Sequence, residues 1–286
     1  MAAALSLPSR DRRPFARSEP AIDSPPPDLR NIFAKDLWHH DLNSTLIASG
    51  REFRLTARQR SRRYPTRLLR YFIPFHWIGR EAARRQRPLT VCEIGIAHGL
   101  MLNYMLHGFE QLHVDPAQVI ARWTGVDVKL LHEYLDKLPY DQLIEANVET
   151  DVASLDLGCD VCIMLHVLEH LFDPEKTIAE VTARLPSGAL FIVGFPAHPH
   201  FIIPYREPHL RAHTNDNGHV SALSARRFNK AAIANDCTIE EARSAYFLRA
   251  SGLFLEDQRW WQKFNMAWGG MFPGWLGEVY IAARKR

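Results

Sequence analysis

Residues 91–100 constrain the fold of this chain more than any other segment. They read Val-Cys-Glu-Ile-Gly-Ile-Ala-His-Gly-Leu, an apolar run that reaches Glu93 and is followed by Gly95 and Gly99. A helical pattern of apolar residues begins directly after Gly99. A strand, a tight glycine turn and a helix N-terminus in this order form a ligand-binding crevice in α/β proteins, because glycines let the backbone approach a ligand closely. We therefore expect an α/β fold with a ligand site at this turn.

Strand-like and helix-like segments alternate from residue 89 onward. We expect strands at 89–94, 123–128, 143–148, 159–165, 189–195, 237–247 and 278–283, and helices at 100–106, 173–185 and 224–235. Within the last of these helices, Phe228 and Ile233 are expected to face inward, and residues 198–218 are expected to form a long polar loop. This alternation predicts a doubly wound, mostly parallel sheet with helices on both faces.

The charge of the chain is distributed unevenly. Residues 1–90 carry 18 Lys and Arg against 8 Asp and Glu, whereas residues 91–286 carry 17 against 24. We expect residues 1–29, rich in Pro, Ser and Arg, to be a disordered tail, and residues 30–88 to be a basic helical arm ahead of the α/β domain at 89–286. We favour an arm that packs on the domain, with its arginines solvated or paired to acidic groups. A surface for anionic substrates, membrane or nucleic acid is the alternative.

The cysteines and the apolar runs bear on the location of the protein. No apolar run approaches the roughly 20 residues of a membrane span, and the N-terminus lacks the length of a signal peptide. Cys159 and Cys162 form a single Cys-x-x-Cys inside a strand-like run, for which we favour buried reduced thiols over a zinc or redox role. We expect a protein of a reducing compartment, the cytoplasm.

A second motif, Thr-Gly-Val-Asp-Val at residues 124–128, places an acidic residue at the end of the second expected strand. Asp127 in this position can accept hydrogen bonds from both ribose hydroxyls of a nucleoside, although it could also cap a helix. It follows Gly99 by 28 positions, more than the roughly 20 of a dinucleotide fingerprint, and we attribute the excess to a loop around residues 113–116. The glycine turn alone would equally suit a nicotinamide-dependent dehydrogenase.

The third motif indicates the family. Residues 159–174, Cys-Asp-Val-Cys-Ile-Met-Leu-His-Val-Leu-Glu-His-Leu-Phe-Asp-Pro, resemble the fourth-strand motif of class I S-adenosylmethionine-dependent methyltransferases. Residues 184–193 look like the family's leucine, proline, glycine and strand element, residues 219–228 like the segment before its last helix, and residues 278–285 like its antiparallel final strand. The pattern is closest to small-molecule methyltransferases of quinone and natural-product pathways. The resemblance implies a Rossmann-like, doubly wound, seven-stranded sheet whose last strand is antiparallel.

The resemblance also implies S-adenosylmethionine as the cofactor and assigns residues to its parts. Glu93, Gly95, Ala97 and Gly99 are expected to contact the methionine and ribose part, and Asp127 is expected to bind the ribose hydroxyls. Val128, Asn147 and Val148 are expected to lie beside the adenine, and His166 near the sulfonium end. Two features depart from the family pattern. The middle glycine is Ala97, and Asn147 stands where the family often has an acidic residue, although its amide can still donate and accept hydrogen bonds.

The candidate catalytic residues are histidines. A general base is needed only if the acceptor loses a proton at attack. His166 and His170 are candidates, and for His170 a structural role stays open. Of the five histidines between residues 197 and 219, His219 is the best candidate, so we expect His170 and His219 to be catalytic. His166, Glu169 and His170 could form part of a transition-metal site, but we expect no metal.

We expect an enzyme that transfers a methyl group from S-adenosylmethionine to a small-molecule or carrier-linked intermediate, with oxygen as the default acceptor atom. A catalytically silent binding protein that uses the basic arm is one alternative. An NAD-dependent oxidoreductase is another, disfavoured because the sequence has no Tyr-x-x-x-Lys motif. Residues 198–218 and 252–276 are expected as substrate-side insertions. The second holds four of the seven tryptophans, which could wall an acceptor pocket, mediate a homodimer or pack against the arm. We do not expect a nucleic-acid partner.

Overall fold

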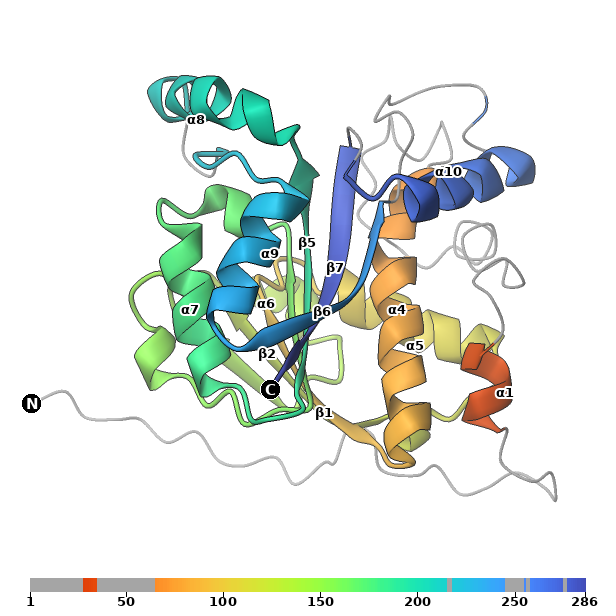
Figure 1. The fold of residues 1–286 in the computed structure, drawn as a ribbon. Coiled ribbons are helices and arrows are strands. Elements are labelled where there is room, and N and C mark those ends of the chain that lie inside the picture. Colours follow the sequence, from red (N-terminus) through yellow and green to blue (C-terminus); the bar gives the residue numbers. More distant parts are fainter. Residues whose placement is uncertain (1–27, 35–64, 215–217, 245–254, 256–257, 275–276) are drawn as a thin grey trace, which may run out of the picture.

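A computed structural model of the chain describes residues 28–34, 65–214, 218–244, 255, 258–274 and 277–286. Its centre is one seven-stranded sheet in the order β3-β2-β1-β4-β5-β7-β6 (Figure 1). The strands are β1 (Leu89–Ile94), β2 (Ile120–Asp127), β3 (Gln142–Glu145), β4 (Val161–Leu165), β5 (Leu190–Ala197), β6 (Cys237–Ser244) and β7 (Gly277–Lys285). The pairs among β1 to β5 are parallel, and β7 is antiparallel to both β5 and β6. The Rossmann-like sheet with an antiparallel last strand is therefore confirmed.

Helices cover both faces of this sheet. They are α1 (Leu29–Ala34), α4 (Pro65–Arg85), α5 (Leu100–Gln111), α6 (His132–Leu135), α7 (Pro174–Arg184), α8 (Ile203–Ala212), α9 (Ala225–Ala234) and α10 (Arg259–Met271), with short 3-10 turns at η2 (Pro116–Gln118), η3 (Val152–Ser154), η4 (Leu168–His170) and η5 (His200–Ile202). Helices α4 and α5 lie on one face and α7 and α9 on the other (Figure 1). The expected tail, residues 1–29, lies outside the described residues except for its last two.

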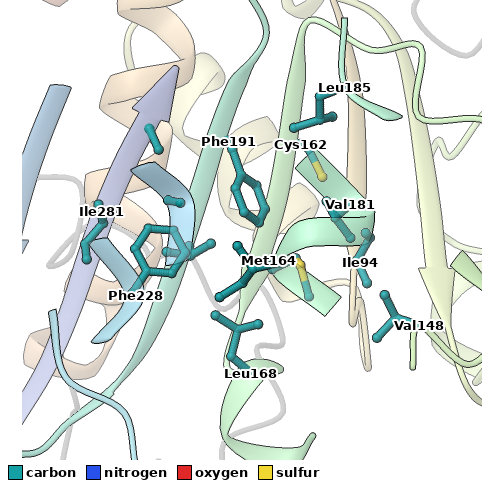
Figure 2. Packing of buried hydrophobic residues seen from close by; sticks show 14 of the residues in the cluster. Ile94, Val148, Cys162, Met164, Leu168, Val181, Leu185, Phe191, Phe228 and Ile281 are labelled. Carbon is teal, nitrogen blue, oxygen red and sulfur yellow. The ribbon is translucent and has the colours of Figure 1, made fainter. Parts of the chain in front are cut away.

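Strand alternation divides the core into two clusters, one on each face of the sheet. On β4, Val161, Ile163 and Leu165 belong to the cluster under α4 and α5, whereas Cys162 and Met164 belong to the cluster under α7 and α9 (Figure 2). The continuous apolar run of β4 is thus explained, because a central parallel strand is buried on both faces.

Two helices begin where the sequence predicted them to begin. The Asp173 carboxylate accepts a hydrogen bond from the Lys176 amide at 3.0 Å and caps α7, and the Ser224 hydroxyl caps α9 in the same way. Phe228 of α9 is buried as expected, but the inward position of Ile233 was wrong, since it is 53% exposed. Five residues of helix rotate the side chain by about 140° relative to Phe228, which turns Ile233 toward solvent.

The described part of the basic arm packs on the domain through α1 and α4. The apolar face of α4 is buried at Leu69, Phe72, Ile73, Phe75, Trp77, Ile78 and Ala82. Its arginines pair with acidic groups of the domain: Arg80 with Glu241 at 2.6 Å and Arg85 with Asp160 at 2.7 Å. The amphipathic pattern of α4 is therefore that of a helix that packs on the domain. Residues 35–64 of the arm lie outside the described residues.

The long loop expected at residues 198–218 is wrong, because this segment contains η5 and α8. Helix α8 has Pro204 in its first turn and Pro208 in its interior, and none of its residues is buried. Ion pairs between side chains hold it in place instead. Glu207 pairs with Arg211 at 2.8 Å and also with Arg227 of α9. A helix without an apolar stripe gives no periodic signal in the sequence.

The tryptophan-rich segment forms α10, which lies against β6 (Figure 1). Met266 enters the same apolar cluster as the buried face of α4, and a Cβ at Gly269 would lie 1.8 Å from the Ser244 carbonyl oxygen, so helix and strand are in close contact. Trp260 and Met271 remain exposed, and Trp275 lies outside the described residues. The three roles considered for this segment stay predictions.

The cysteines and the helix lengths agree with the sequence analysis. All four cysteines, Cys92, Cys159, Cys162 and Cys237, are free and buried. None of the helices in the described ranges combines the length and the apolar character that a membrane crossing requires.

We predict that Glu81→Gln weakens the junction between arm and domain. Glu81 is 3% exposed and pairs with Arg84, Arg85 and Arg284, and although burial alone would raise its pKa, these hydrogen bonds hold the pKa of Glu81 well below its usual range. The substitution should lower the free energy of unfolding at pH 7 by roughly 2 kcal/mol, because it leaves arginines without a full partner.

Urea unfolding at several pH values measures this effect. A carboxylate with a lowered pKa stabilises the fold above pH 4.5 and loses that effect on acidification, so the difference from the parent should shrink as the pH falls below about 4. The control is Glu180→Gln, which alters a surface pair with Lys176 at 3.6 Å. Equal stabilities of the two variants at pH 7 would contradict the prediction.

Candidate functional site

The glycine turn after β1 is built from left-handed backbone. Gly95, Ala97 and Gly99 have φ angles of +81°, +45° and +69°, a region that glycine adopts freely and alanine does not. A Cβ at Gly95 would lie 2.2 Å from Cγ2 of Val167, so this glycine is required by space as well as by conformation. The turn therefore brings the backbone of β1 against the segment that follows β4.

A cavity of about 630 Å³ opens beside this turn, at the carboxyl ends of the parallel strands. It is lined by eight of the eleven residues that the sequence analysis singled out: Gly95, Ala97, Asp127, Val128, Asn147, Val148, His166 and His170. Its position matches the rule that ligands of open α/β sheets bind beyond the carboxyl ends of the strands. Three motifs that lie far apart in the sequence thus meet in one hollow.

Asp127 occupies the end of β2 and is tied to the glycine turn. One oxygen of its carboxylate accepts the Ala97 amide at 2.8 Å, and the other accepts the Lys129 amide at 3.2 Å. Each oxygen keeps a further lone pair for a ligand hydroxyl. The Asn147 side chain is hydrogen-bonded within its own loop, because its oxygen accepts a hydrogen bond from the Glu149 amide at 2.9 Å.

Glu93, Gly99 and His219 do not line the cavity. Glu93 is buried on the opposite face of β1, where it accepts hydrogen bonds from the Trp123 indole at 3.1 Å and the Tyr140 hydroxyl at 3.4 Å. Gly99 faces the side chains of Leu138 and Tyr140. That Glu93 and Gly99 contact the cofactor and that His219 is catalytic stay predictions.

The sequence analysis missed nine lining residues. They are Ile94, Ala146, Glu149, Val167, Leu171, Phe172, Thr214, Gly218 and Val220. Val167, Leu171 and Phe172 lie inside the recognised motif of residues 159–174, and Phe172 is a large apolar side chain that is 60% exposed. Glu149 accepts the amides of Phe172 and Asp173 at 2.6 and 3.2 Å and so joins the two walls of the cavity.

His166 is fixed between two carboxyl groups. It has a left-handed backbone with φ of +57°, its Nδ1 lies 3.1 Å from Oε1 of Glu169, and its Nε2 lies 3.3 Å from Oε2 of Glu278 on β7. Burial alone would lower the pKa of His166, but the charge of Glu278 and the hydrogen bonds with both carboxyl groups raise it. His166 is therefore held in place between two carboxyl groups, which its two ring nitrogens face.

Glu278 continues this network into the arm. Its side chain has no exposed surface and lies 2.5 Å from the Arg70 guanidinium and 2.6 Å from the Tyr280 hydroxyl. Burial alone would raise the pKa of Glu278, but His166, Arg70 and Tyr280 lower it below its usual range. Arg70 of α4 is thus connected to His166 in the cavity wall through the buried carboxylate of Glu278.

His170 and His219 face each other at the far side of the same turn. Their ring centroids are 5.0 Å apart, and Nδ1 of His170 lies 3.1 Å from the Gly218 carbonyl oxygen. Nδ1 is then the donor, which leaves Nε2 as the basic nitrogen of a neutral His170 ring. The residues on either side of His219, Gly218 and Val220, line the cavity.

Residues 57–242 match the family described as a methyltransferase domain. The chain belongs to this methyltransferase family. The match spans more than half of the sequence and agrees with the three motifs, so the protein is a class I methyltransferase that uses S-adenosylmethionine. No curated protein matches the sequence.

Several solved structures are similar to this chain. A Galdieria sulphuraria protein, proposed to be a sarcosine dimethylglycine methyltransferase, is 12% identical, with 74% of this chain and 84% of that chain covered and a TM-score of 0.50. The 1,6-didemethyltoxoflavin-N1-methyltransferase of Burkholderia thailandensis is 13% identical over 92% and 93% of the chains, with a TM-score of 0.46. A Mesorhizobium loti S-adenosylmethionine-dependent methyltransferase is 13% identical over 76% and 98%, with a TM-score of 0.47. At these identities the likeness concerns the fold.

We predict that Gly95→Ala damages the cofactor site of this methyltransferase. The added Cβ meets Val167 at 2.2 Å and must adopt a φ of +81°, so the turn has to shift, at a cost of about 1–3 kcal/mol in the free energy of unfolding. Gly274→Ala is the control, because a Cβ there meets nothing within 4 Å. Thermal unfolding and S-adenosylhomocysteine titration measure both effects. The double change Gly95→Ala with Val167→Ala should recover part of the loss, and parental behaviour of the single variant would refute the prediction.

We also predict that Glu93→Gln stabilises the protein at neutral and alkaline pH. Burial raises the pKa of Glu93 to about 8, despite the hydrogen bonds from Trp123 and Tyr140. A group whose pKa is raised on folding stabilises fully below its unfolded value near 4.5 and loses that effect as the pH rises to 8. Glutamine keeps an acceptor oxygen without the charge.

The measurement is the free energy of unfolding of Glu93→Gln and parent between pH 5 and 8.5. The variant should gain stability relative to the parent as the pH rises, by on the order of 2–4 kcal/mol at pH 8. A pH-independent difference would show that Glu93 is ionised in the folded protein.

Proposed function

We propose that this methyltransferase transfers the methyl group to an oxygen of a small-molecule or carrier-linked acceptor, and that the 630 Å³ cavity holds cofactor and acceptor together. The observation that carries the proposal is the meeting of the glycine turn, Asp127 and His170 in that one cavity. Because the sulfonium methyl is already activated, alignment of donor and acceptor can supply much of the acceleration.

The residues fit the parts of S-adenosylmethionine. Asp127 offers carboxylate lone pairs to the ribose hydroxyls, and the exposed Val128 offers an apolar surface to the adenine. Asn147 and Val148 follow at the adenine edge, and the backbone of Gly95 and Ala97 leaves room for the methionine part. In this arrangement His166 stands near the sulfonium, and its Nε2 lies 3.3 Å from the Glu278 carboxylate.

The acceptor then approaches from the side of His170 and His219. Phe172, Thr214 and Val220 give that side a mixed apolar and polar lining suited to a small molecule. Nε2 of His170 is the nitrogen available to bind the acceptor or to take its proton. The cytoplasmic location and the homodimer expected from the sequence stay predictions.

The test is calorimetric titration of the full chain with S-adenosylhomocysteine and with NADH. The parent should bind only the former, and Asp127→Ala should weaken that binding about tenfold or more, since ribose hydroxyls lose their acceptors. Asp136→Ala is the matched control, because this exposed aspartate contacts His132 outside the cavity. Binding of NADH alone would favour the oxidoreductase alternative. Binding of neither would leave the silent binding protein, which a salt-dependent affinity for nucleic acid, lost without residues 1–88, would support.

A further inference from the structure

We infer that Glu169, His170 and His219 form a binding site for a divalent transition-metal ion on the acceptor side of the cavity. One potential ligand atom of each residue lies within 4.8 Å of the others, so the three side chains converge on one point. The sequence analysis expected no metal and considered His166 as the second histidine of such a site. The structure uses both ring nitrogens of His166 elsewhere and brings in His219, which lies 50 positions after Glu169.

The carboxyl group of Glu169 is the independent observation that points to a cation. Glu169 is 2% exposed, and its Oε1 is 3.1 Å from Nδ1 of His166. Its other oxygen, Oε2, is buried and accepts no hydrogen bond from the described residues. A buried carboxylate oxygen without a partner carries a large desolvation cost, which a bound cation would remove.

The ligands are held in place by the backbone around them. The Glu169 carbonyl oxygen accepts the amides of Val220 and Ser221 at 2.9 and 3.0 Å, and the Ser221 hydroxyl donates to the Leu171 carbonyl at 2.7 Å. These bonds fasten the segment of His219 to the turn of Glu169. Donation from Nδ1 of His170 to the Gly218 carbonyl fixes the tautomer that presents Nε2, which is the usual outer support of a metal-bound histidine.

The donor set selects the class of ion. Two imidazoles and one carboxylate suit Zn²⁺, Co²⁺ or Ni²⁺, whereas Mg²⁺ and Ca²⁺ prefer oxygen ligands. Ligands about 2.1 Å from a tetrahedral ion lie about 3.4 Å apart, so small rotations of the rings close the site. Three protein ligands leave a coordination position open.

The proposed ion site borders the cavity, because His170 lines it, as do Gly218 and Val220 on either side of His219. A bound ion would lower the pKa of an acceptor hydroxyl placed there, so that its proton could pass to water. The resulting oxygen would form the new bond to the methyl carbon as the S–CH3 bond breaks, and S-adenosylhomocysteine would leave. This last step rests on the proposed function, whereas binding of the ion does not. The inference gives the acceptor a class: a molecule whose oxygen can ligate a metal.

The test is titration of the metal-free full-length protein with Co²⁺, followed by its visible absorption, and with Zn²⁺ by calorimetry. We expect one ion per chain, with ligand-field bands and without the intense band of a cobalt–thiolate bond that the buried cysteines would produce. His219→Ala and Glu169→Gln should each weaken binding about tenfold or more. His213→Ala is the matched control, because His213 pairs with His209 on α8 at 4.3 Å between ring centroids and should leave the affinity unchanged.

Absence of saturable binding, a thiolate band, or a loss caused by His213→Ala in place of His219→Ala would overturn the inference. S-adenosylhomocysteine titration of His219→Ala separates the two proposals, since the variant should bind this cofactor product like the parent. If the parent binds S-adenosylhomocysteine and no metal, the ion site fails while the proposed function stands. If it binds metal and no S-adenosylhomocysteine, the reverse holds.

Discussion

Glu278 is the residue on which the connection between arm, sheet and cavity depends. It is a carboxylate on β7 with no exposed surface, and such a charge is tolerated only when cations and hydrogen bonds replace water. Arg70 of α4 supplies a cation, and Nε2 of His166 in the cavity wall lies 3.3 Å from the carboxylate. Neither partner could be removed without leaving a buried charge, so the arm is a structural part of the site and not an appended tail. The basic character of α4 has the same origin, since Arg80 and Arg85 also face acidic groups of the domain.

The glycine turn imposes the second constraint, because it decides what can lie beside β1. With no side chain at Gly95, Val167 fills the space directly above the strand, and the turn after β4 comes close enough to share a cavity with the turn after β1. Asp127 then locks the left-handed Ala97 through its amide. A strained alanine in this place is acceptable because both neighbouring structures fix it.

The sequence predicted what depends on local pattern. The strand β1, the caps of α7 and α9, and eight of the residues that line the cavity follow from apolar runs, capping residues and glycines, all of which act over a few positions. It failed where distant residues decide the outcome. Helix α8 has no apolar stripe and exists through ion pairs with α9, Ile233 is exposed by the rotation of its helix, and the pairing of Arg70 with Glu278 joins residues 208 positions apart. For the same reason, His166 could be named as a site residue but not assigned its carboxyl partners.

The three polar side chains of the turn after β4, His166, Glu169 and His170, make contacts with different parts of the structure. His166 is directed to β7, where Glu278 holds it, so it positions the wall of the cavity and has no ring nitrogen left for an acceptor. Glu169 lies between, bonded to His166 on one oxygen and buried on the other. His170 is directed to the segment of His219 by its bond to Gly218. Under the proposed function, activation of the acceptor therefore falls to His170, His219 and the second oxygen of Glu169, whether they act through a bound ion or directly on the acceptor's proton. The left-handed backbone of His166 marks the sharp turn at which this division begins.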